Sequence, residues 1–330
     1  MPSKIMAADS DCEQVPVIDL SLLKYGLDHH DSEITYTKVR KACEEWGCFQ
    51  VVNHEIEEEI IHQMDSAVRD TFALSKETKQ ECNSVVGWNV GYFTDMPSLP
   101  FYESIRVPGA PDPAAIQKFS DHLWPQGNPK ICKIIEDYTS RVEELTINII
   151  KIILRSFGVA HYYSTCQFEG ILRMCFCSSP AREKGGCHSH TDQSCVTVMY
   201  QDNTGGLQVE SKAGKWADVK PAPNSFFVFT GDSFKAWSNG RVHSVRHRVV
   251  CENSSRVSVP YFYFFSDQTL IDAPPELVDD EHPRLYKPFA YGDYKDYCQP
   301  KKRATSMRVQ NFLTAFEETF LDEFAGISIS

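Results

Sequence analysis

Residues 194–210 read S-C-V-T-V-M-Y-Q-D-N-T-G-G-L-Q-V-E. Residues 194–201 and 207–210 are two short runs rich in β-branched and apolar side chains, a composition typical of strands. Gly205 and Gly206 lie between them and are typical of a tight hairpin turn. The segment therefore predicts two strands joined by a turn, and it indicates a β structure for the C-terminal half of the chain.

Similar short runs occur on both sides of this segment, separated by turn signals such as Ala213-Gly214. They cover residues 171–177, 216–219, 225–230, 249–251 and 257–265. Short strands at this spacing are typical of a sandwich or barrel of the jelly-roll kind. We therefore expect an α+β protein with a double-stranded β-helix (jelly-roll, cupin-like) core.

The N-terminal half has a different periodicity. Apolar residues at helical spacing predict helices over 36–46, 57–74 and 131–157, with short strands at 15–20 and 48–53. Residues 85–113 show no sustained period and are expected to be irregular, with room for short strands. A further helix is expected over 304–324. We expect three regions, a mainly helical one (1–165), the jelly-roll core (166–303) and a C-terminal helix packing near the active site (304–330).

Composition excludes several classes of protein. The chain has 330 residues, 33 Lys and Arg against 45 Asp and Glu, and a net charge of −12, which disfavours binding to nucleic acid. The longest strongly apolar segment, 147–154, is too short to span a bilayer, and residues 1–13 have no apolar signal-peptide core. The 12 cysteines are spread along the chain and read as reduced thiols. We expect a cytoplasmic monomer whose partner is a small molecule, with no membrane or nucleic-acid partner.

One short motif has the residue types of a metal site. His190-Thr191-Asp192 is expected where a strand begins, and residues i and i+2 of a strand point to the same face. His243 or His247 would supply the third ligand. Two histidines and one carboxylate leave open positions on the metal, as in non-haem Fe(II) oxygenases.

A second motif complements the first. In Arg256-Val257-Ser258 the guanidinium and the hydroxyl share one face of an expected strand, where they can bind a carboxylate. A dicarboxylate could then chelate the metal at one end and bind Arg256 at the other.

Each motif has a simpler interpretation. His188 and His190 form an H-x-H pair that would suit zinc. Arg256 alone would more simply be part of a surface ion pair. His54 is interpreted as a structural histidine.

The chain as a whole resembles the plant 2-oxoglutarate- and Fe(II)-dependent dioxygenases of specialised and hormone metabolism. Two segments, L-W-P-Q-G-N at 123–128 and P-P-E-L-V-D-D-E-H-P-R-L-Y-K-P-F at 274–289, resemble the subgroup of glucosinolate side-chain dioxygenases and auxin-oxidising dioxygenases. The wider resemblance rests on V-P-V-I-D-L (15–20), A-C-E-E-W-G-C-F-Q-V-V-N-H (42–54), H-T-D (190–192), G-G-L-Q-V (205–209), G-K-W-A-D-V-K-P (214–221), N-S-F-F-V-F-T-G-D (224–232), W-S-N-G-R-V-H-S-V-R-H-R-V (237–249) and R-V-S (256–258).

The resemblance implies a ligand set and a reaction. In the family's N-G-R-x-x-S-x-x-H-R pattern the iron ligand matches His247, so the metal ligands would be His190, Asp192 and His247. Arg256 and Ser258 would bind the distal carboxylate of 2-oxoglutarate. The cofactors would be Fe(II), 2-oxoglutarate and O2, with ascorbate as a reductant. Decarboxylation of 2-oxoglutarate to succinate would be coupled to oxidation of a substrate C–H bond, by hydroxylation, desaturation or a related reaction.

The chain departs from the family at one position. Where relatives carry N-Y-Y or a similar motif, this chain reads Met174-Cys175-Phe176, and Phe176 lacks the hydroxyl that would help to bind the cosubstrate. Candidates for an apolar substrate pocket are Phe101, Tyr102 and Phe176, together with Trp88, Phe93 and Phe119.

The substrate would be a small plant hormone or specialised metabolite. Two other functions stay open at this point, a related Fe(II) oxidase that does not consume 2-oxoglutarate and a non-catalytic metal-binding jelly-roll module.

Overall fold

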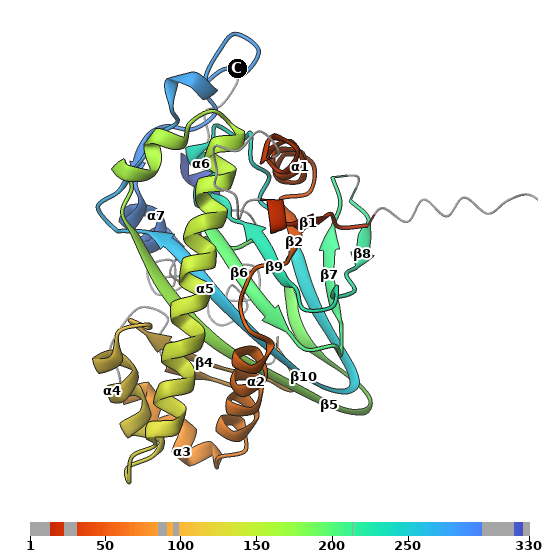
Figure 1. Cartoon of the computed structure of the whole chain (residues 1–330), viewed down its shortest axis with the longest axis vertical. Coiled ribbons are helices and arrows are strands. Elements are labelled where there is room, and N and C mark those ends of the chain that lie inside the picture. Colours follow the sequence, from red (N-terminus) through yellow and green to blue (C-terminus); the bar gives the residue numbers. More distant parts are fainter. Residues whose placement is uncertain are drawn as a thin grey trace, which may run out of the picture.

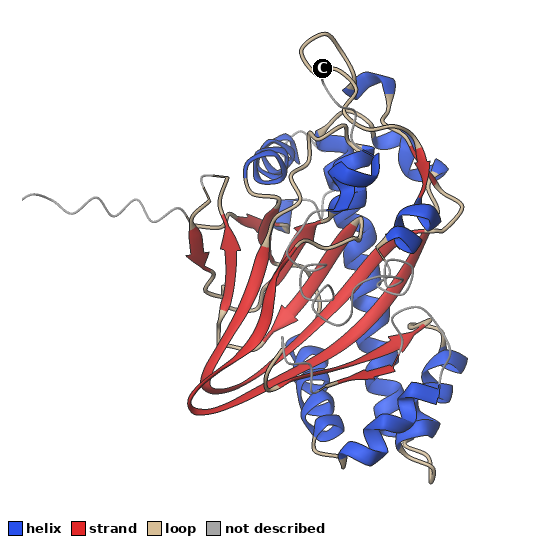
Figure 2. Cartoon of the chain, turned by 180° about the vertical axis from the view of Figure 1, so that it is seen from behind, coloured by secondary structure: helices blue, strands red, loops and turns tan. Residues whose placement is uncertain are grey.

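The structure, a computed structural model, describes residues 14–22, 32–84, 91–94, 99–212, 214–298 and 320–325. Most of its strands form one large curved sheet, shown from both sides in Figures 1 and 2. Along this sheet the strands follow the order β1 (Val17–Asp19), β2 (Cys48–Val52), β9 (Phe226–Thr230), β6 (Val196–Gln201), β10 (His247–Phe265), β5 (Phe168–His190), β4 (Tyr102–Pro108) and β3 (Gly91–Phe93). All of these pairs are antiparallel except β1–β2.

β5 and β10 form a long ribbon that links two parts of the sheet. They pair from Phe168↔Phe265 at one end to His190↔His247 at the other. The C-terminal half of β10 also pairs with β6, and its first residues pair with β7 (Leu207–Glu210), which in turn pairs with β8 (Trp216–Asp218). This topology confirms the expected α+β fold with a jelly-roll core.

The boundaries of the ribbon differ from the sequence prediction. The strands expected at 249–251 and 257–265 are one strand, and the strand expected at 171–177 continues to His190. In the sequence, the polar residues between these two runs suggest a turn. Asn253 instead takes a positive φ of 49° at an irregularity in the register between Glu252 and Ser254, so the chain passes through without leaving the sheet.

Helices cover one face of this sheet (Figure 1). α5 (Pro129–Ser156) packs against α1 (Ser32–Glu45), α2 (Glu58–Phe72) and α4 (Pro113–Leu123), and it also contacts β6 and β10. The expected apolar stripe of α5 is buried through Tyr138, Val142 and Ile149. The Asn128 side chain caps its first turn by accepting a hydrogen bond from the Ile131 N–H. The three helices expected in this half are therefore confirmed.

Several elements are not predicted by periodicity. β3 and β4 lie in the stretch expected to be irregular, and α4 follows directly, with Pro113 in its first turn and Asp112 as its cap. The remaining short elements are α3 (Lys76–Gln80), η2 (Glu81–Ser84), η3 (Ala160–Thr165), α6 (Asp232–Trp237), β11 (Leu270–Ile271), η4 (Pro275–Leu277), β12 (Phe289–Ala290) and α7 (Tyr291–Tyr297).

The expected C-terminal helix falls largely outside the described residues. Residues 304–319 are not described, and α10 (Phe320–Ala325) is a short helix that contacts α6 and α7. Every cysteine in the described ranges is free, as expected for reduced thiols. No helix in this part of the chain combines the length and apolar composition needed to cross a membrane.

Candidate metal centre and carboxylate site

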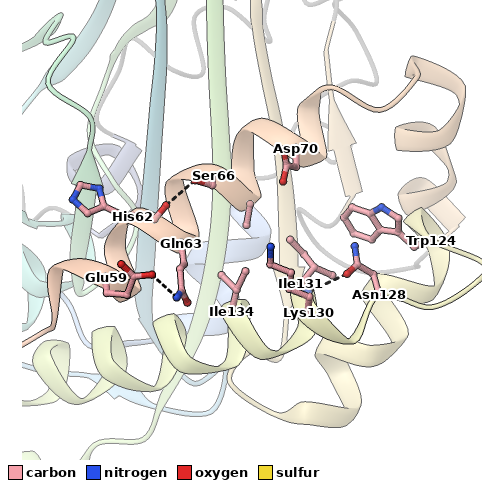
Figure 3. Close-up of a pocket in the computed structure, with 11 residues that line it drawn as sticks. Glu59, His62, Gln63, Ser66, Asp70, Trp124, Asn128, Lys130, Ile131 and Ile134 are labelled. Carbon is pink, nitrogen blue, oxygen red and sulfur yellow. Dashed lines mark hydrogen bonds between the residues drawn. The ribbon is translucent and has the colours of Figure 1, made fainter.

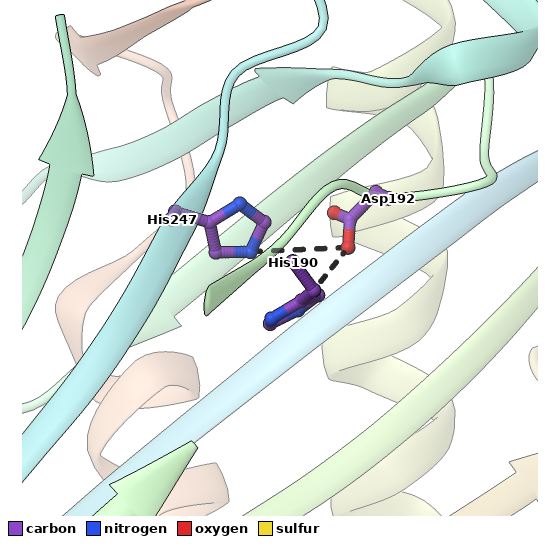
Figure 4. A group of neighbouring side chains, drawn as sticks. All are labelled: His190, Asp192 and His247. Carbon is purple, nitrogen blue, oxygen red and sulfur yellow. Dashed lines mark ion pairs between the residues drawn. The ribbon is translucent and has the colours of Figure 1, made fainter. Parts of the chain in front are cut away.

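Three of the predicted side chains converge at one end of the β5–β10 ribbon (Figure 4). His190 is the last residue of β5, His247 is the first residue of β10, and the two are register partners. Asp192 lies in the loop between β5 and β6, so the H-T-D motif ends a strand rather than beginning one. Its Oδ1 is 3.7 Å from His190 Nε2 and 3.8 Å from His247 Nε2. The candidate ligand atoms all lie within 4.8 Å of one another.

Hydrogen bonds turn the ligand atoms toward the centre of this cluster. Nδ1 of His190 lies 2.8 Å from the His188 carbonyl oxygen, and Nδ1 of His247 lies 3.3 Å from that of Val245. With Nδ1–H donating to a carbonyl, each imidazole presents an unprotonated Nε2 to a metal. The Thr197 hydroxyl donates to Asp192 Oδ2 at 2.6 Å, which leaves Oδ1 to face the two histidines.

The backbone around Asp192 is equally constrained. The Asp232 N–H donates to the Asp192 carbonyl oxygen at 2.7 Å. A Cβ at Gly231 would lie 2.2 Å from the Ser194 carbonyl oxygen and 2.6 Å from that of Asp192, so only glycine fits there. On the other side of the cluster, the Phe229 ring stacks on His247 with ring centroids 4.6 Å apart.

Burial and neighbouring groups shift the pKa values of the two histidines in opposite directions. Burial, together with the charge of His190, lowers the pKa of His247. Burial also opposes protonation of His190, but the Cys187 thiol and the Asp192 carboxylate outweigh it and raise the pKa of His190. A bound cation would compete with protons for the Nε2 atoms of both histidines.

The geometry separates the predicted ligands from the alternatives. Among the described residues, His190, Asp192 and His247 are the one group of three His, Cys, Asp or Glu side chains that converges this closely, and neither His188 nor His243 belongs to it. Burial lowers the pKa of His243 to about 4. A donor set of two neutral imidazoles and one carboxylate suits Fe(II) with open coordination positions.

Arg256 lies deep inside the sheet, with 3% of its surface exposed. One of its terminal nitrogens donates to the Ser258 hydroxyl at 2.8 Å, the other donates to the Gln201 side-chain oxygen, and Nε donates to the Gly205 carbonyl oxygen at 2.8 Å. All three acceptors are neutral, so the guanidinium is held in place without a carboxylate bound to it. This burial excludes a surface ion pair.

A tyrosine lies on the same face of the sheet as Arg256. Cys177 pairs with Arg256 on one side and with Tyr102 of β4 on the other, so the three side chains form one cross-strand row. The Tyr102 hydroxyl donates to Cys175 Sγ at 3.1 Å. Sequence reasoning named Tyr102 only as an aromatic, since the pairing of β4 with β5 is not visible in the sequence.

Phe176 does not lie in this row. Its ring stacks on Phe72 of α2 with ring centroids 5.6 Å apart, on the helix-covered face of the sheet. Alternation along β5 therefore turns Cys175 and Cys177, rather than Phe176, toward Arg256. Phe101 is 40% exposed and adopts a positive φ of 60° in the turn before β4. Trp88 lies outside the described residues.

A cavity of about 420 Å³ lies elsewhere, between α2 and α5 (Figure 3). Helix residues and the segment before α5 line it, among them His62, Asp70, Trp124, Lys130 and Ile134. No strand residue contributes to its wall, so this cavity is separate from the metal cluster.

Two family sequence patterns match the chain. The 2OG-Fe(II) oxygenase superfamily pattern matches residues 159–265, which include the metal cluster and Arg256. The pattern described as "non-haem dioxygenase in morphine synthesis N-terminal" matches residues 15–125.

Similar proteins are found among curated sequences and solved structures. The probable 2-oxoglutarate-dependent dioxygenase AOP1 of Arabidopsis thaliana is 33% identical, over 92% of this chain and 96% of its own length. The crystal structure of the rice dioxygenase for auxin oxidation (DAO) is 30% identical, with a TM-score of 0.75 over 92% of this chain and 99% of that one. A 2-oxoglutarate binary complex of AtDAO1 from Arabidopsis is 28% identical, with a TM-score of 0.72 over 82% of this chain and 100% of that one.

These similarities favour one of the three functions considered. The relatives are named as 2-oxoglutarate-dependent dioxygenases, and a solved neighbour is a complex with 2-oxoglutarate, so neither the oxidase that spares 2-oxoglutarate nor the non-catalytic module is supported. The chain belongs to the 2OG-Fe(II) oxygenase superfamily and is an Fe(II)- and 2-oxoglutarate-dependent dioxygenase.

Proposed function

We propose that this dioxygenase uses 2-oxoglutarate and O2 to oxidise a C–H bond of a small plant hormone or specialised metabolite. The proposal rests first on the convergence of His190, Asp192 and His247 inside a sheet that also buries Arg256, whose hydrogen-bond acceptors are all neutral. It is supported by relatives named for auxin oxidation and as gibberellin 20 oxidases.

His190 and His247 would hold Fe(II) through Nε2, and Asp192 would hold it through Oδ1. When bound, the iron would supply the chemistry for O2 activation and for oxidative decarboxylation of 2-oxoglutarate to succinate and CO2. The chain's own contribution is to keep the imidazoles neutral and aimed, through the carbonyl oxygens of His188 and Val245. Water exclusion follows from burial of the cluster, since Asp192 is 6% and His247 is 7% exposed.

Arg256 and Ser258 would bind the distal carboxylate of 2-oxoglutarate. The three neutral acceptors fix the plane of the guanidinium before the cosubstrate arrives, so little side-chain entropy is lost on binding. We add Tyr102 to this site, because Cys177 pairs with both Tyr102 and Arg256, which puts the two side chains on the same face of the sheet. It would supply there the phenolic group that is absent from β5 itself.

We also propose that the protein is a cytoplasmic monomer without a nucleic-acid or membrane partner, with ascorbate as a reductant. The net charge of −12 and the free cysteines in the described ranges support this environment. Gel filtration of the purified protein tests the oligomeric state.

Succinate formation tests the proposed reaction. The full chain is incubated with Fe(II), 2-oxoglutarate and a panel of small plant metabolites, and succinate is measured with and without iron. We expect iron-dependent succinate, and its loss in Asp192→Ala. Asp218→Ala is the matched control, because Asp218 is an exposed carboxylate of β8 that bonds Gln208. Full activity of Asp192→Ala would overturn the ligand assignment.

A further inference from the structure

Two arginines inside the sheet lack a polar partner. Arg106 of β4 and Arg173 of β5 are register partners, so their side chains lie next to each other on one face. Arg106 is 7% exposed, and the Nε of each arginine is buried without a hydrogen-bond partner. No hydrogen bond or ion pair to either guanidinium is formed by any residue that the structure describes.

Each of these two guanidiniums lies over an aromatic ring. The Arg106 guanidinium lies 5.6 Å from the ring centroid of Phe93, and that of Arg173 lies 5.8 Å from the ring centroid of Phe262. Such stacking orients a guanidinium but leaves its N–H groups without acceptors. Arg256 on the same face contrasts with this, since each of its three side-chain nitrogens donates to a protein acceptor.

A buried cation next to a second, partly buried cation, with no carboxylate bonded to either guanidinium among the described residues, is costly in the free protein. Burial first, and then the charge of Arg173, lower the pKa of Arg106 well below its usual range. A buried charge is normally paired, because desolvation is otherwise uncompensated. A ligand that brings a negative charge would relieve this cost.

The pair lies beside the proposed reaction site. Cys175, two residues along β5 from Arg173, pairs with Ser258, so the arginines are about 7 Å along the strand from the row of Ser258. The charge of Asp192, with those of Tyr102 and Cys175, opposes the effect of burial on the pKa of Arg106. Arg106 also lines a cavity of about 250 Å³ with Lys118, His122 and several apolar groups.

We propose that Arg106 and Arg173 together bind an anionic group of the organic substrate, a carboxylate or a sulfate ester. This inference rests on the proposed function, and it narrows the substrate to a small acid with an apolar body. The cosubstrate and the substrate then have separate anion sites, Arg256 for 2-oxoglutarate and the arginine pair for the molecule that is oxidised.

Calorimetry on the full chain loaded with Mn(II), which prevents turnover, separates the two sites. The probes are 2-oxoglutarate alone and then, in its presence, phenylacetate, indole-3-acetate, their primary amides and phenyl sulfate. We expect at least one acid to bind about tenfold more tightly than its amide or neutral counterpart, as one charge-assisted contact predicts. Tighter binding of phenyl sulfate than of the carboxylates would identify a sulfate site.

Substitution of each arginine tests the assignment. Arg106→Gln and Arg173→Gln should each weaken binding of the acid about 10- to 100-fold and leave the affinity for 2-oxoglutarate unchanged, while Arg106→Lys restores part of the loss. Without ligand, the glutamine variants should melt at or above the wild-type temperature, because each removes an unpaired buried charge. Arg155→Gln is the control, since Arg155 stacks on Tyr36 in the helical layer.

The outcomes distinguish this inference from the function on which it rests. Equal binding of acids and amides, failure of every acid to bind at millimolar concentration, or unchanged acid binding in both glutamine variants would overturn the arginine site. Failure of the wild-type protein to bind 2-oxoglutarate would instead overturn the proposed function. If Arg106→Gln does not fold, Arg173→Gln and Arg106→Lys still test whether the arginine pair binds the acid.

Discussion

The hydroxyl of Thr197 offers a sharp test of how the metal centre is organised. Thr197 is buried, and its hydroxyl donates to Asp192 Oδ2 at 2.6 Å. Thr197→Val removes this donor and keeps nearly the same shape. The Asp192 carboxylate then loses the bond that directs Oδ1 toward the two histidines, and it becomes free to rotate.

The size of the effect follows from the type of bond. A hydrogen bond to a charged group contributes about 1.5–3 kcal/mol, which corresponds to about 10- to 150-fold in an equilibrium constant. Partners of metal ligands typically change metal affinity by about 10- to 100-fold when they are removed. We therefore expect Thr197→Val to weaken metal binding within this range.

Competition with a metal-binding dye measures the affinity, with Mn(II) or Fe(II) under anaerobic conditions. Thr197→Ser should retain most of the affinity because it keeps the hydroxyl. Thr146→Val is the matched control, since Thr146 is also buried and bonds a carbonyl oxygen, that of Val142 in α5. If Thr197→Val binds metal as tightly as the wild-type protein, the hydroxyl does not organise the centre and the reasoning is refuted.

Four further predictions concern the same region. Arg256→Gln should raise the KM for 2-oxoglutarate about 10- to 100-fold, much more than the KM for the substrate, and equal effects in steady-state assays would contradict its role. Tyr102→Phe should raise the KM for 2-oxoglutarate about 2- to 10-fold, because it removes one neutral hydrogen bond. An unchanged KM would show that the Tyr102 hydroxyl does not bind 2-oxoglutarate. Gly231→Ala should abolish metal binding or folding, since its Cβ would lie 2.2 and 2.6 Å from two carbonyl oxygens. Circular dichroism measures folding and dye competition measures metal binding. A folded variant that binds metal would disprove the steric argument. Metal at 100 times its Kd should raise the free energy of unfolding, measured in urea, by about 2.7 kcal/mol, and a chelator should reverse this increase. An unfolding midpoint that is the same with and without metal would show that no metal site forms.

Local sequence information predicts part of this structure well. The helices around Tyr138 and Val68 and the strands around Val198 and Phe227 follow from periodicity and β-branched composition, because their buried faces are continuous. The alternation that puts Arg256 and Ser258 on one face is likewise visible in three consecutive residues. The convergence of His190 and His247 depends on strand pairing, and here the resemblance to a family supplied what the residues alone left open.

Other features depend on contacts that the sequence does not display. Nothing local predicts that β4 pairs with β5, and this pairing alone puts Tyr102 opposite Cys177 and Arg106 opposite Arg173. The position of Phe176 has a different cause: alternation along β5 turns it toward the helices, away from the face of Cys175. Strand parity could have indicated this, since residues 175 and 177 share a face that 176 does not.

The position of β4 at the side of the ribbon has a consequence for protein engineering. The proposed iron ligands and the arginine for 2-oxoglutarate come from β5, β10 and the loop that follows β5, whereas Arg106 and Tyr102 come from a strand that pairs with this ribbon only through β5. With Tyr102 kept for the cosubstrate, the other residues of β4 that face the interior can be exchanged as a cassette while the proposed iron ligands and Arg256 stay in place. A library confined to this one strand is thus an economical route to altered selectivity.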